Sequence, residues 1–287
     1  MKKDANRSAQ LKLTISRIVV YAILIFLSFL CLFFFYLMFV NSTRSHGQLQ
    51  SGFTLIPANN FFTNFYNAWH DSDINIPVGM KNSFIVAITS GALTTYFSAL
   101  TAYGTYVYNF RFKKLVHLFI LAIMMIPSQV SAVGFIQLAF KYNLTNKLWV
   151  LIIPSVAAPA VYFYMYQYLQ ATLPLDMVEA ARIDGSNEFR IFNEIVLPIM
   201  KPAIAVQMIF SFVGSWNNYF MPNLLLNKPD VKTVPVMIAT LRSADYSKFD
   251  MGKVYMLMLM AILPVMVIYV ILSKSIIKGV TSGSVKG

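Results

Sequence analysis

The side chains with the greatest chemical potential in this sequence are gathered in one short charged segment, residues 176–198. This segment holds five of the eleven acidic residues, namely Asp176, Glu179, Asp184, Glu188 and Glu194, with Arg182 and Arg190 between them. Carboxylates and guanidinium groups at this density form ion pairs and polar contacts on a water-facing surface. Because no nucleophile elbow or similar constellation accompanies them, we expect a water-facing surface and not a catalytic site. The alternative to a functional surface is a plain solvated connector.

The sequence contains no recognisable motif for a metal site or a nucleotide-binding site. The histidines, His46, His70 and His117, are scattered without an H-E-x-x-H pattern, and the one cysteine, Cys31, has no partner for a disulfide or a thiolate metal site. The Gly-Lys pair at residues 252–253 lacks the upstream glycine of a phosphate-binding loop. We therefore predict no enzymatic activity, no metal site and no cofactor bound by this chain.

Uncharged polar residues inside the long apolar runs form a second candidate set. Amides and hydroxyls can bind the hydroxyl groups of a carbohydrate, and Trp or Tyr can stack on the apolar face of a sugar ring. The candidates are Gln129, Ser131 and Gln137 in one run, and Ser211, Ser215, Trp216, Asn217, Asn218 and Tyr219 in another. The alternative is that these residues only hold helices together by hydrogen bonds.

Composition places these residues in a membrane protein. Of 287 residues, 57% are hydrophobic and 12% are charged, whereas ordinary globular chains have about 25% charged residues. The net charge of +12 comes from short basic clusters beside apolar runs, so we interpret it as a topology signal and predict no nucleic-acid binding. No acidic residue lies inside an apolar run, so the usual ionisable group of a proton- or sodium-coupled transporter is missing.

Six apolar runs are long enough to cross a bilayer core of about 30 Å. We predict an all-α polytopic protein with six transmembrane helices, within a domain of residues 18–273, at residues 18–40, 83–108, 115–140, 148–171, 203–226 and 254–273. The basic N-terminal stretch, residues 1–17, is expected in the cytoplasm. Since successive connections alternate between the two sides of the membrane, the charged segment and the tail, residues 274–287, are expected in the cytoplasm too. The outer segment 228–253 is basic and so departs from the positive-inside rule.

Two short helices are expected within the charged segment. Asp176 can cap the first helix, because a glutamate follows three residues later as in a capping box. Gly185 can supply the left-handed turn that ends this helix. Ser186 or Asn187 then begins a second helix, whose apolar residues recur at helical spacing until Pro198 closes it.

The order of residues in this segment is specific: EAARIDG occupies residues 179–185, FNEIVLP occupies 192–198, and Lys201 and Pro202 follow. It resembles the EAA loop of importer-type ABC transporter permeases. In that family the loop is a cytoplasmic coupling helix that docks in a cleft of the ATPase subunit. The resemblance implies ATPase contact through Glu179, Ala180, Ala181, Asp184 and Gly185, with Glu179 as the key coupling residue.

Further stretches are similar to the sugar-transporting branch of these permeases, at residues 81–112, at 125–130 (MIPSQV) and at 214–222 (GSWNNYFMP). The ending KGVTSGSVKG, residues 278–287, resembles one of the two permeases that such systems pair, the one like the smaller maltose-system subunit. This chain departs from the family in having Gly104 where alanine is more frequent and Asn218 where an acidic residue is common. The second departure bears on substrate contacts.

The resemblance implies a permease subunit of an ATP-driven importer of a di- or oligosaccharide in the bacterial cell membrane. The implied partners are a second homologous permease, two ATPase subunits that hold ATP and Mg, an extracellular solute-binding protein, the sugar and membrane lipid. The implied tail contacts with the ATPase are Gly283, Ser284, Lys286 and Gly287. We hypothesise that Tyr246 and Phe249 contact the binding protein. Alternatives are a permease for another small solute and a non-ABC channel or receptor.

Overall fold

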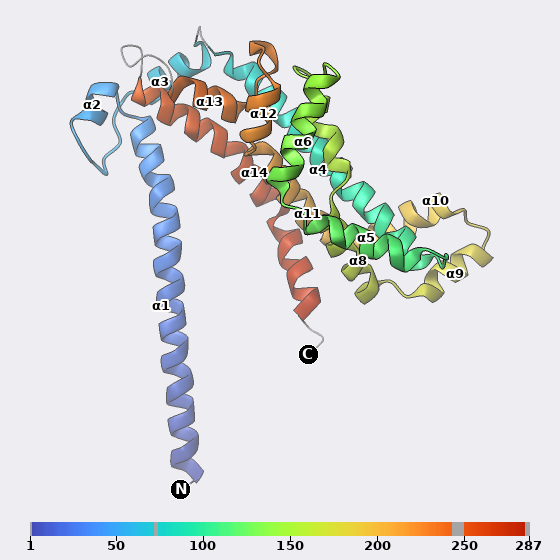
Figure 1. The fold of residues 1–287 in the computed structure, drawn as a ribbon. Coiled ribbons are helices and arrows are strands. Elements are labelled where there is room, and N and C mark those ends of the chain that lie inside the picture. Colours follow the sequence, from blue (N-terminus) through green and yellow to red (C-terminus); the bar gives the residue numbers. More distant parts are fainter. Residues whose placement is uncertain (1, 72–73, 243–249, 285–287) are drawn as a thin grey trace. The chain divides into compact units, whose positions relative to one another are not determined.

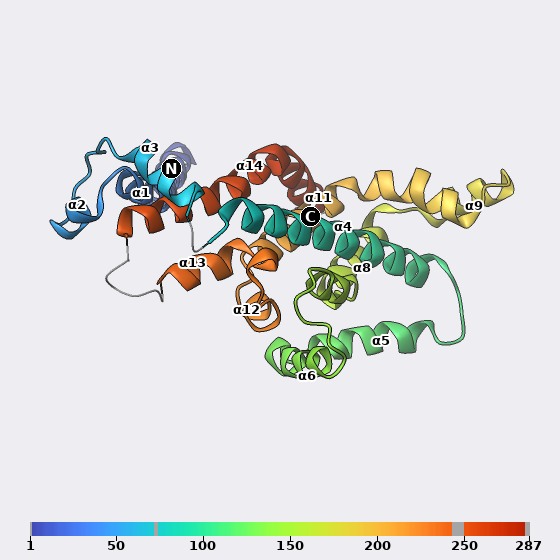
Figure 2. The same cartoon turned by 90° about the horizontal axis from the view of Figure 1, so that it is seen from above.

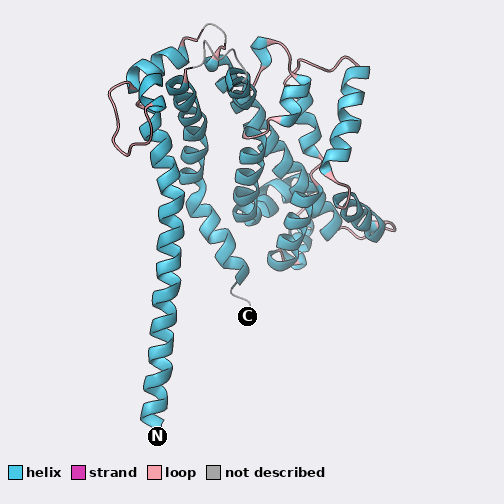
Figure 3. Ribbon diagram, turned by 60° about the vertical axis from the view of Figure 1, so that its left-hand side comes forward, coloured by secondary structure: helices cyan, strands magenta, loops and turns pink. Residues whose placement is uncertain are grey.

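The computed structural model describes residues 2–71, 74–242 and 250–284, and within these ranges every regular element is a helix (Figure 3). The all-α prediction is confirmed. The elements, shown in Figure 1, are α1 (Lys2–Ser42), α2 (His46–Gln50), α3 (Phe61–Trp69), α4 (Ile76–Val107), α5 (Lys113–Met124), α6 (Ser128–Lys141), α7 (Trp149–Ile152), η1 (Ile153–Val156), α8 (Pro159–Thr172), α9 (Leu175–Ile183), α10 (Glu188–Arg190), η2 (Ile191–Val196), α11 (Leu197–Trp216), α12 (Phe220–Leu225), η3 (Pro229–Val231), α13 (Val234–Arg242) and α14 (Met251–Ser284).

Within the described residues, five helical stretches are long and apolar enough to cross a membrane: Leu13–Ser42, Ile76–Val107, Trp149–Thr172, Glu188–Trp216 and Met251–Ser273. The sixth candidate is the pair α5 and α6, whose axes are bent by 93° at the break between them. The predicted straight helix over residues 115–140 is therefore two helices. Pro127 explains the break, because the residue before a proline is pushed out of helical conformation and proline has no N–H to donate.

The fifth predicted helix is displaced toward the N-terminus. The helical stretch begins at Glu188 and ends at Trp216, whereas the apolar run predicts residues 203–226. After Trp216 the chain turns, and the Asn218 side chain accepts a hydrogen bond from the backbone N–H of Met221 at the start of α12. An asparagine competes for backbone donors in this way, so the apolar run continues while the helix does not.

The chain divides into two compact units. The first unit consists of Met1–Ala68 and Asp245–Met260. Its polar centre is the buried Asn64, whose Nδ2 donates to the carbonyl oxygens of Ser42 at 2.8 Å and Arg44 at 2.9 Å. Gly252 packs here, and a Cβ at this position would lie 2.5 Å from the Arg44 carbonyl oxygen. The backbone of this unit thus approaches too closely for any residue but glycine.

The second unit consists of Trp69–Ala244 and Ala261–Gly287, and α4 packs along both α8 and α11 (Figure 2). The packed side of α4 is built from small residues such as Ala87, Gly91 and Ala99. A Cβ on Gly91 would lie 2.9 Å from the sulfur of Met208 in α11. Small residues at this spacing allow helix backbones to approach closely inside a membrane.

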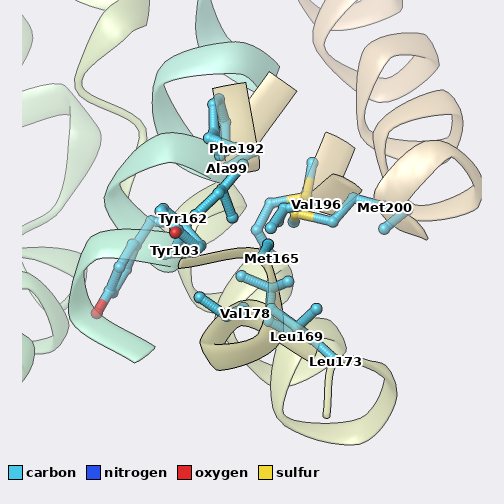
Figure 4. Packing of buried hydrophobic residues seen from close by; sticks show 14 residues of the cluster. Ala99, Tyr103, Tyr162, Met165, Leu169, Leu173, Val178, Phe192, Val196 and Met200 are labelled. Carbon is cyan, nitrogen blue, oxygen red and sulfur yellow. The ribbon is translucent and has the colours of Figure 1, made fainter. Parts of the chain in front are cut away.

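The main buried cluster of this unit joins α4, α8, α9 and the helix that enters α11. Figure 4 shows its side chains in contact, among them Ala99, Tyr103, Tyr162, Met165, Leu169, Leu173, Val178, Phe192, Val196 and Met200. Val178, Phe192 and Val196 belong to the charged segment. One side of that segment is therefore part of the hydrophobic core and packs against α4 and α8.

Candidate functional site

The first helix of the charged segment ends in a Schellman motif. Gly185 has φ of +79°. The N–H of Ser186 donates to the carbonyl of Ala181 at 3.0 Å, and the N–H of Gly185 donates to the carbonyl of Arg182 at 3.0 Å. Glycine adopts this left-handed conformation without the steric cost that a Cβ imposes. The predicted turn at Gly185 is confirmed.

The predicted cap at Asp176 is wrong. The N-cap residue is Pro174, α9 begins at Leu175, and Asp176 lies in the first turn, with no side-chain cap hydrogen bond at this helix start. Pro174 has φ of −67° and an extended ψ of 131°. Its backbone is therefore not helical, and α9 begins at the next residue. Asp176 still lies where a negative charge interacts favourably with the helix dipole.

The second helix begins as predicted but does not end at Pro198. The side-chain oxygen of Asn187 accepts a hydrogen bond from the backbone N–H of Arg190 at 2.8 Å, which makes Asn187 the N-cap. The helix then passes through a π-helical stretch, Ile191–Val196, directly into α11, where Pro198 lies in the first turn. The change of hydrogen-bond register at that point removes the need for an N–H at residue 198.

The charged segment has one buried side and one exposed face. Val178 and Ala181 are buried in the core cluster, whereas the side chains of Ile183 and Phe189 are 86% and 72% exposed. The exposed face also contains Glu179, Ala180, Asp184 and Gly185. Of the five residues of this segment that are predicted to contact an ATPase, only Ala181 faces inward. Two large apolar side chains are thus exposed on the same segment as the carboxylates of Glu179 and Asp184.

A cluster that we call the Glu188 clamp joins the charged segment to α4. Arg182 Nε donates to Glu188 Oε1 at 2.6 Å, and the Tyr103 hydroxyl donates to Glu188 Oε2 at 2.7 Å. The Arg182 guanidinium also lies over the ring of Tyr108, 5.3 Å from its centroid. The clamp thus closes the Gly185 turn and attaches it to a second helix.

Electrostatics favour the protonated forms of Arg182 and of its ring partner Tyr108. The hydrogen bond to Glu188 raises the pKa of the Arg182 guanidinium, and burial together with the same carboxylate raises the pKa of the Tyr108 phenol. Sequence reasoning missed the clamp. The available signal was a pair of opposite charges on either side of the Gly185 turn, which by itself only indicates a surface ion pair.

The second unit contains a cavity of about 410 Å³ between α4, α8, α11 and the η1 turn. Its lining is uncharged, and its polar members are Ser90, Thr94, Ser155, Ser211, Ser215 and Asn218. Ser90 is only 3% exposed, and within the described part of the chain its hydroxyl has no hydrogen-bond partner. A buried hydroxyl normally has such a partner, and this one belongs to a residue that lines the cavity.

The predicted pathway residues are divided between this cavity and other places. Ser215, Asn218 and Ser211 line it. Trp216 is 2% exposed and points away into the core, where its Nε1 donates to the carbonyl of Ala261 at 3.0 Å. The others are exposed on the chain outside the lining: Gln129, Ser131, Gln137, Asn217 and Tyr219.

Sequence reasoning also missed the contribution of α4 to the cavity. Ser90 and Thr94 are four residues apart, so they share one face of the helix. That spacing was visible in the sequence, but small hydroxyl residues at such spacing usually mark helix packing.

Several predicted contacts cannot be placed. Tyr246, Phe249, Lys286 and Gly287 lie outside the described residues, and Gly283 and Ser284 form the end of α14. Among the residues that the structure describes, no group of three His, Cys, Asp or Glu side chains could hold a metal ion.

Residues 83–279 match the family model described as "Binding-protein-dependent transport system inner membrane component". The match begins within α4, includes the charged segment and ends in α14. It therefore covers the Glu188 clamp, the cavity and the exposed face together.

Individual relatives agree in length as well as in sequence. The arabinooligosaccharides transport system permease protein of Bacillus subtilis is 34% identical over 209 residues, which is 72% of each chain. The melibiose/raffinose/stachyose import permease protein of the same organism is 31% identical over 255 residues, covering 88% of this chain and 91% of that one. A chain from a crystal structure of a bacterial ABC transporter for import of the acidic polysaccharide alginate superimposes with a TM-score of 0.79 at 20% identity, covering 91% of this chain and 96% of that one, and so shares its fold.

Proposed function

The chain belongs to the family of binding-protein-dependent transport system inner membrane components and is a permease subunit of an ABC importer, and we propose that it imports an uncharged di- or oligosaccharide. The observation that carries the sugar assignment is the uncharged cavity with its hydroxyl and amide lining. Uncharged hydroxyl and amide groups recognise sugar hydroxyls by hydrogen bonds that need no compensating charge.

The size and charge of the cavity favour a neutral sugar. Its volume of about 410 Å³ lies within the range of about 300–1,000 Å³ that small-molecule sites occupy. An acidic sugar would find no cationic partner for its carboxylate in this uncharged lining. The relatives named for arabinooligosaccharides and for melibiose, raffinose and stachyose support the same substrate class.

ATP hydrolysis belongs to a partner subunit in this proposal. The sequence has no phosphate-binding loop, and the exposed face of the charged segment offers Ile183 and Phe189 beside the carboxylates of Glu179 and Asp184. We assign this face to the ATPase, with both termini of the chain in the cytoplasm, as the basic N-terminus favours. Two ATPase subunits then bind ATP and Mg, and this chain responds to their movement.

A second permease is supported by the break between α5 and α6. The break lies within a candidate membrane span, and Met125 is 84% exposed there. Irregular backbone is tolerated at membrane depth only where protein covers it or where it lines a water-filled cavity. A second permease of the same fold supplies such a cover, and the pathway for the sugar lies where the two meet. An extracellular binding protein delivers the sugar to the outer side.

The test is sugar uptake by the whole complex in proteoliposomes. The expected result is ATP-dependent uptake of a neutral oligosaccharide and no uptake of a uronic-acid oligosaccharide of the same length. Ser215→Leu, which fills the cavity, should abolish uptake, whereas Ser28→Leu on the exposed surface of α1 should not. Uptake without ATP would indicate a channel, and equal uptake of the acidic sugar would refute the assigned substrate class.

A further inference from the structure

Glu188 contacts two different helices with its two carboxylate oxygens. Oε1 accepts from Arg182, at the end of α9, and Oε2 accepts from the hydroxyl of Tyr103, in α4. One side chain therefore bridges the two arms of the Gly185 turn and a membrane-spanning helix. An ordinary surface ion pair bridges only its two partners and contributes little.

The α4 side of this contact is buried. Tyr103 is 2% exposed, and its ring centroid lies 5.5 Å from that of Phe192, in the helix that follows Glu188. Apolar packing of this kind is not directional. The hydrogen bonds to Glu188 are directional, so they fix the orientation of the charged segment against α4 as well as its distance.

The other end of α4 is attached to the segment that precedes α13. Asn82 Nδ2 donates to the carbonyl oxygens of Asp230 at 2.9 Å and Lys232 at 3.0 Å, and the N–H of Val234 donates to the Ser83 hydroxyl at 2.9 Å. Between these contacts and the Glu188 clamp, α4 is one unbroken helix, Ile76–Val107. A helix of this length has a span of roughly 48 Å at about 1.5 Å per residue.

We propose that Glu188 is a positioning residue that fixes the charged segment to α4, so that movement of this segment is transmitted to α4 and, through Asn82 and Ser83, to residues 230–234. The inference rests on the proposed function, because it assumes that an ATPase moves the exposed face. Without the clamp, the segment can follow the ATPase while α4 stays behind. ATP is then hydrolysed without sugar transport.

The experiment uses the complete complex in proteoliposomes and measures the ratio of ATP hydrolysed to sugar imported. The variants are Glu188→Gln, Tyr103→Phe and the two combined. Glu194→Gln is the matched control, because Glu194 forms a 2.7 Å ion pair with Arg190 within its own exposed helical turn. Each single variant should raise the ratio about tenfold, as loss of a hydrogen bond to a charged group allows, and the control should not.

The double variant and hydrogen exchange distinguish a positioning role of Glu188 from a purely local effect on the charged segment. If the clamp acts as one unit, the double variant is no worse than the more severe single variant, because effects within one network are not additive. Amide exchange of residues 188–196 should accelerate in Glu188→Gln but not in Glu194→Gln, whether or not transport is active. A wild-type complex without sugar uptake would refute the proposed function. Faster exchange with an unchanged ATP-to-sugar ratio, or additive effects in the double variant, would overturn the positioning role alone.

Discussion

Replacing Gly185 by alanine should loosen the end of α9 through backbone strain alone. A Cβ at this position would meet no atom within 4 Å, so no steric clash with the surroundings is involved. The φ of +79° is the whole cause, and it costs an L-residue about 1–2 kcal/mol. The local opening equilibrium of the Schellman motif should therefore increase by a factor of about 5–30.

Hydrogen exchange measures this opening directly, because the N–H groups of Gly185 and Ser186 close the motif. Exchange of peptides covering residues 180–190 should accelerate by about 5- to 30-fold in Gly185→Ala, and ATP-driven uptake should fall with it. Gly185→Asn should be milder, since asparagine tolerates the left-handed region better than alanine. Gly104→Ala is the control, because Gly104 lies within α4 and a Cβ there would meet no atom within 4 Å. Its effect on stability should be neutral or slightly favourable. Equal exchange in the alanine and asparagine variants would refute the strain explanation.

Three further substitutions test other parts of the structure. Asn187→Ala removes the N-cap side chain that accepts a hydrogen bond from the backbone N–H of Arg190, which should destabilise this helix by about 1 kcal/mol. Amide hydrogen exchange in residues 188–193 should then become faster, whereas Asn187→Ser should keep the cap and the protection. Trp216→Phe keeps the ring packing but loses the hydrogen bond to Ala261, so the free energy of unfolding should fall by about 0.5–1.5 kcal/mol in denaturant titration. Gly252→Ala would place a Cβ 2.5 Å from the Arg44 carbonyl oxygen and should destabilise the first unit by about 1–3 kcal/mol, measured as a lower melting temperature; an unchanged melting temperature would contradict the close backbone approach.

The all-α class follows from sequence, and so do five membrane-spanning stretches within the described residues, because length and apolar composition report directly on membrane spans. Local backbone chemistry was also readable where one residue decides it, as at Gly185 and Asn187. The sequence was misleading where an apolar run continues beyond the end of the helix, as after Trp216. It was also misleading at Pro198, which lies where the helical hydrogen-bond pattern changes from π to α. Hydropathy averages over a window, so it does not detect a single residue that redirects the backbone.

The candidate site was only partly predictable. Glu179 and Asp184 were selected because their order in the chain matches a family pattern, and the structure exposes both. The Glu188 clamp was not found, because Tyr103 is 85 positions away in the sequence and meets Glu188 only through tertiary packing. For the same reason, sequence reasoning grouped Trp216 with the pathway residues, whereas the structure buries its ring between Phe84 and Phe212.

Cross-linking from residue 183 to the ATPase tests most directly whether the charged segment transmits ATP-driven movement. Ile183→Cys in a Cys31→Ser background places a thiol at a site where the native side chain is 86% exposed. A bifunctional thiol reagent should link this position to an ATPase subunit, with a yield that changes when ATP is added, while Ser28→Cys should give no such product. Full ATP-driven uptake by the Ile183→Cys complex, with no cross-link to the ATPase in any nucleotide state, would contradict the assigned role of the charged segment.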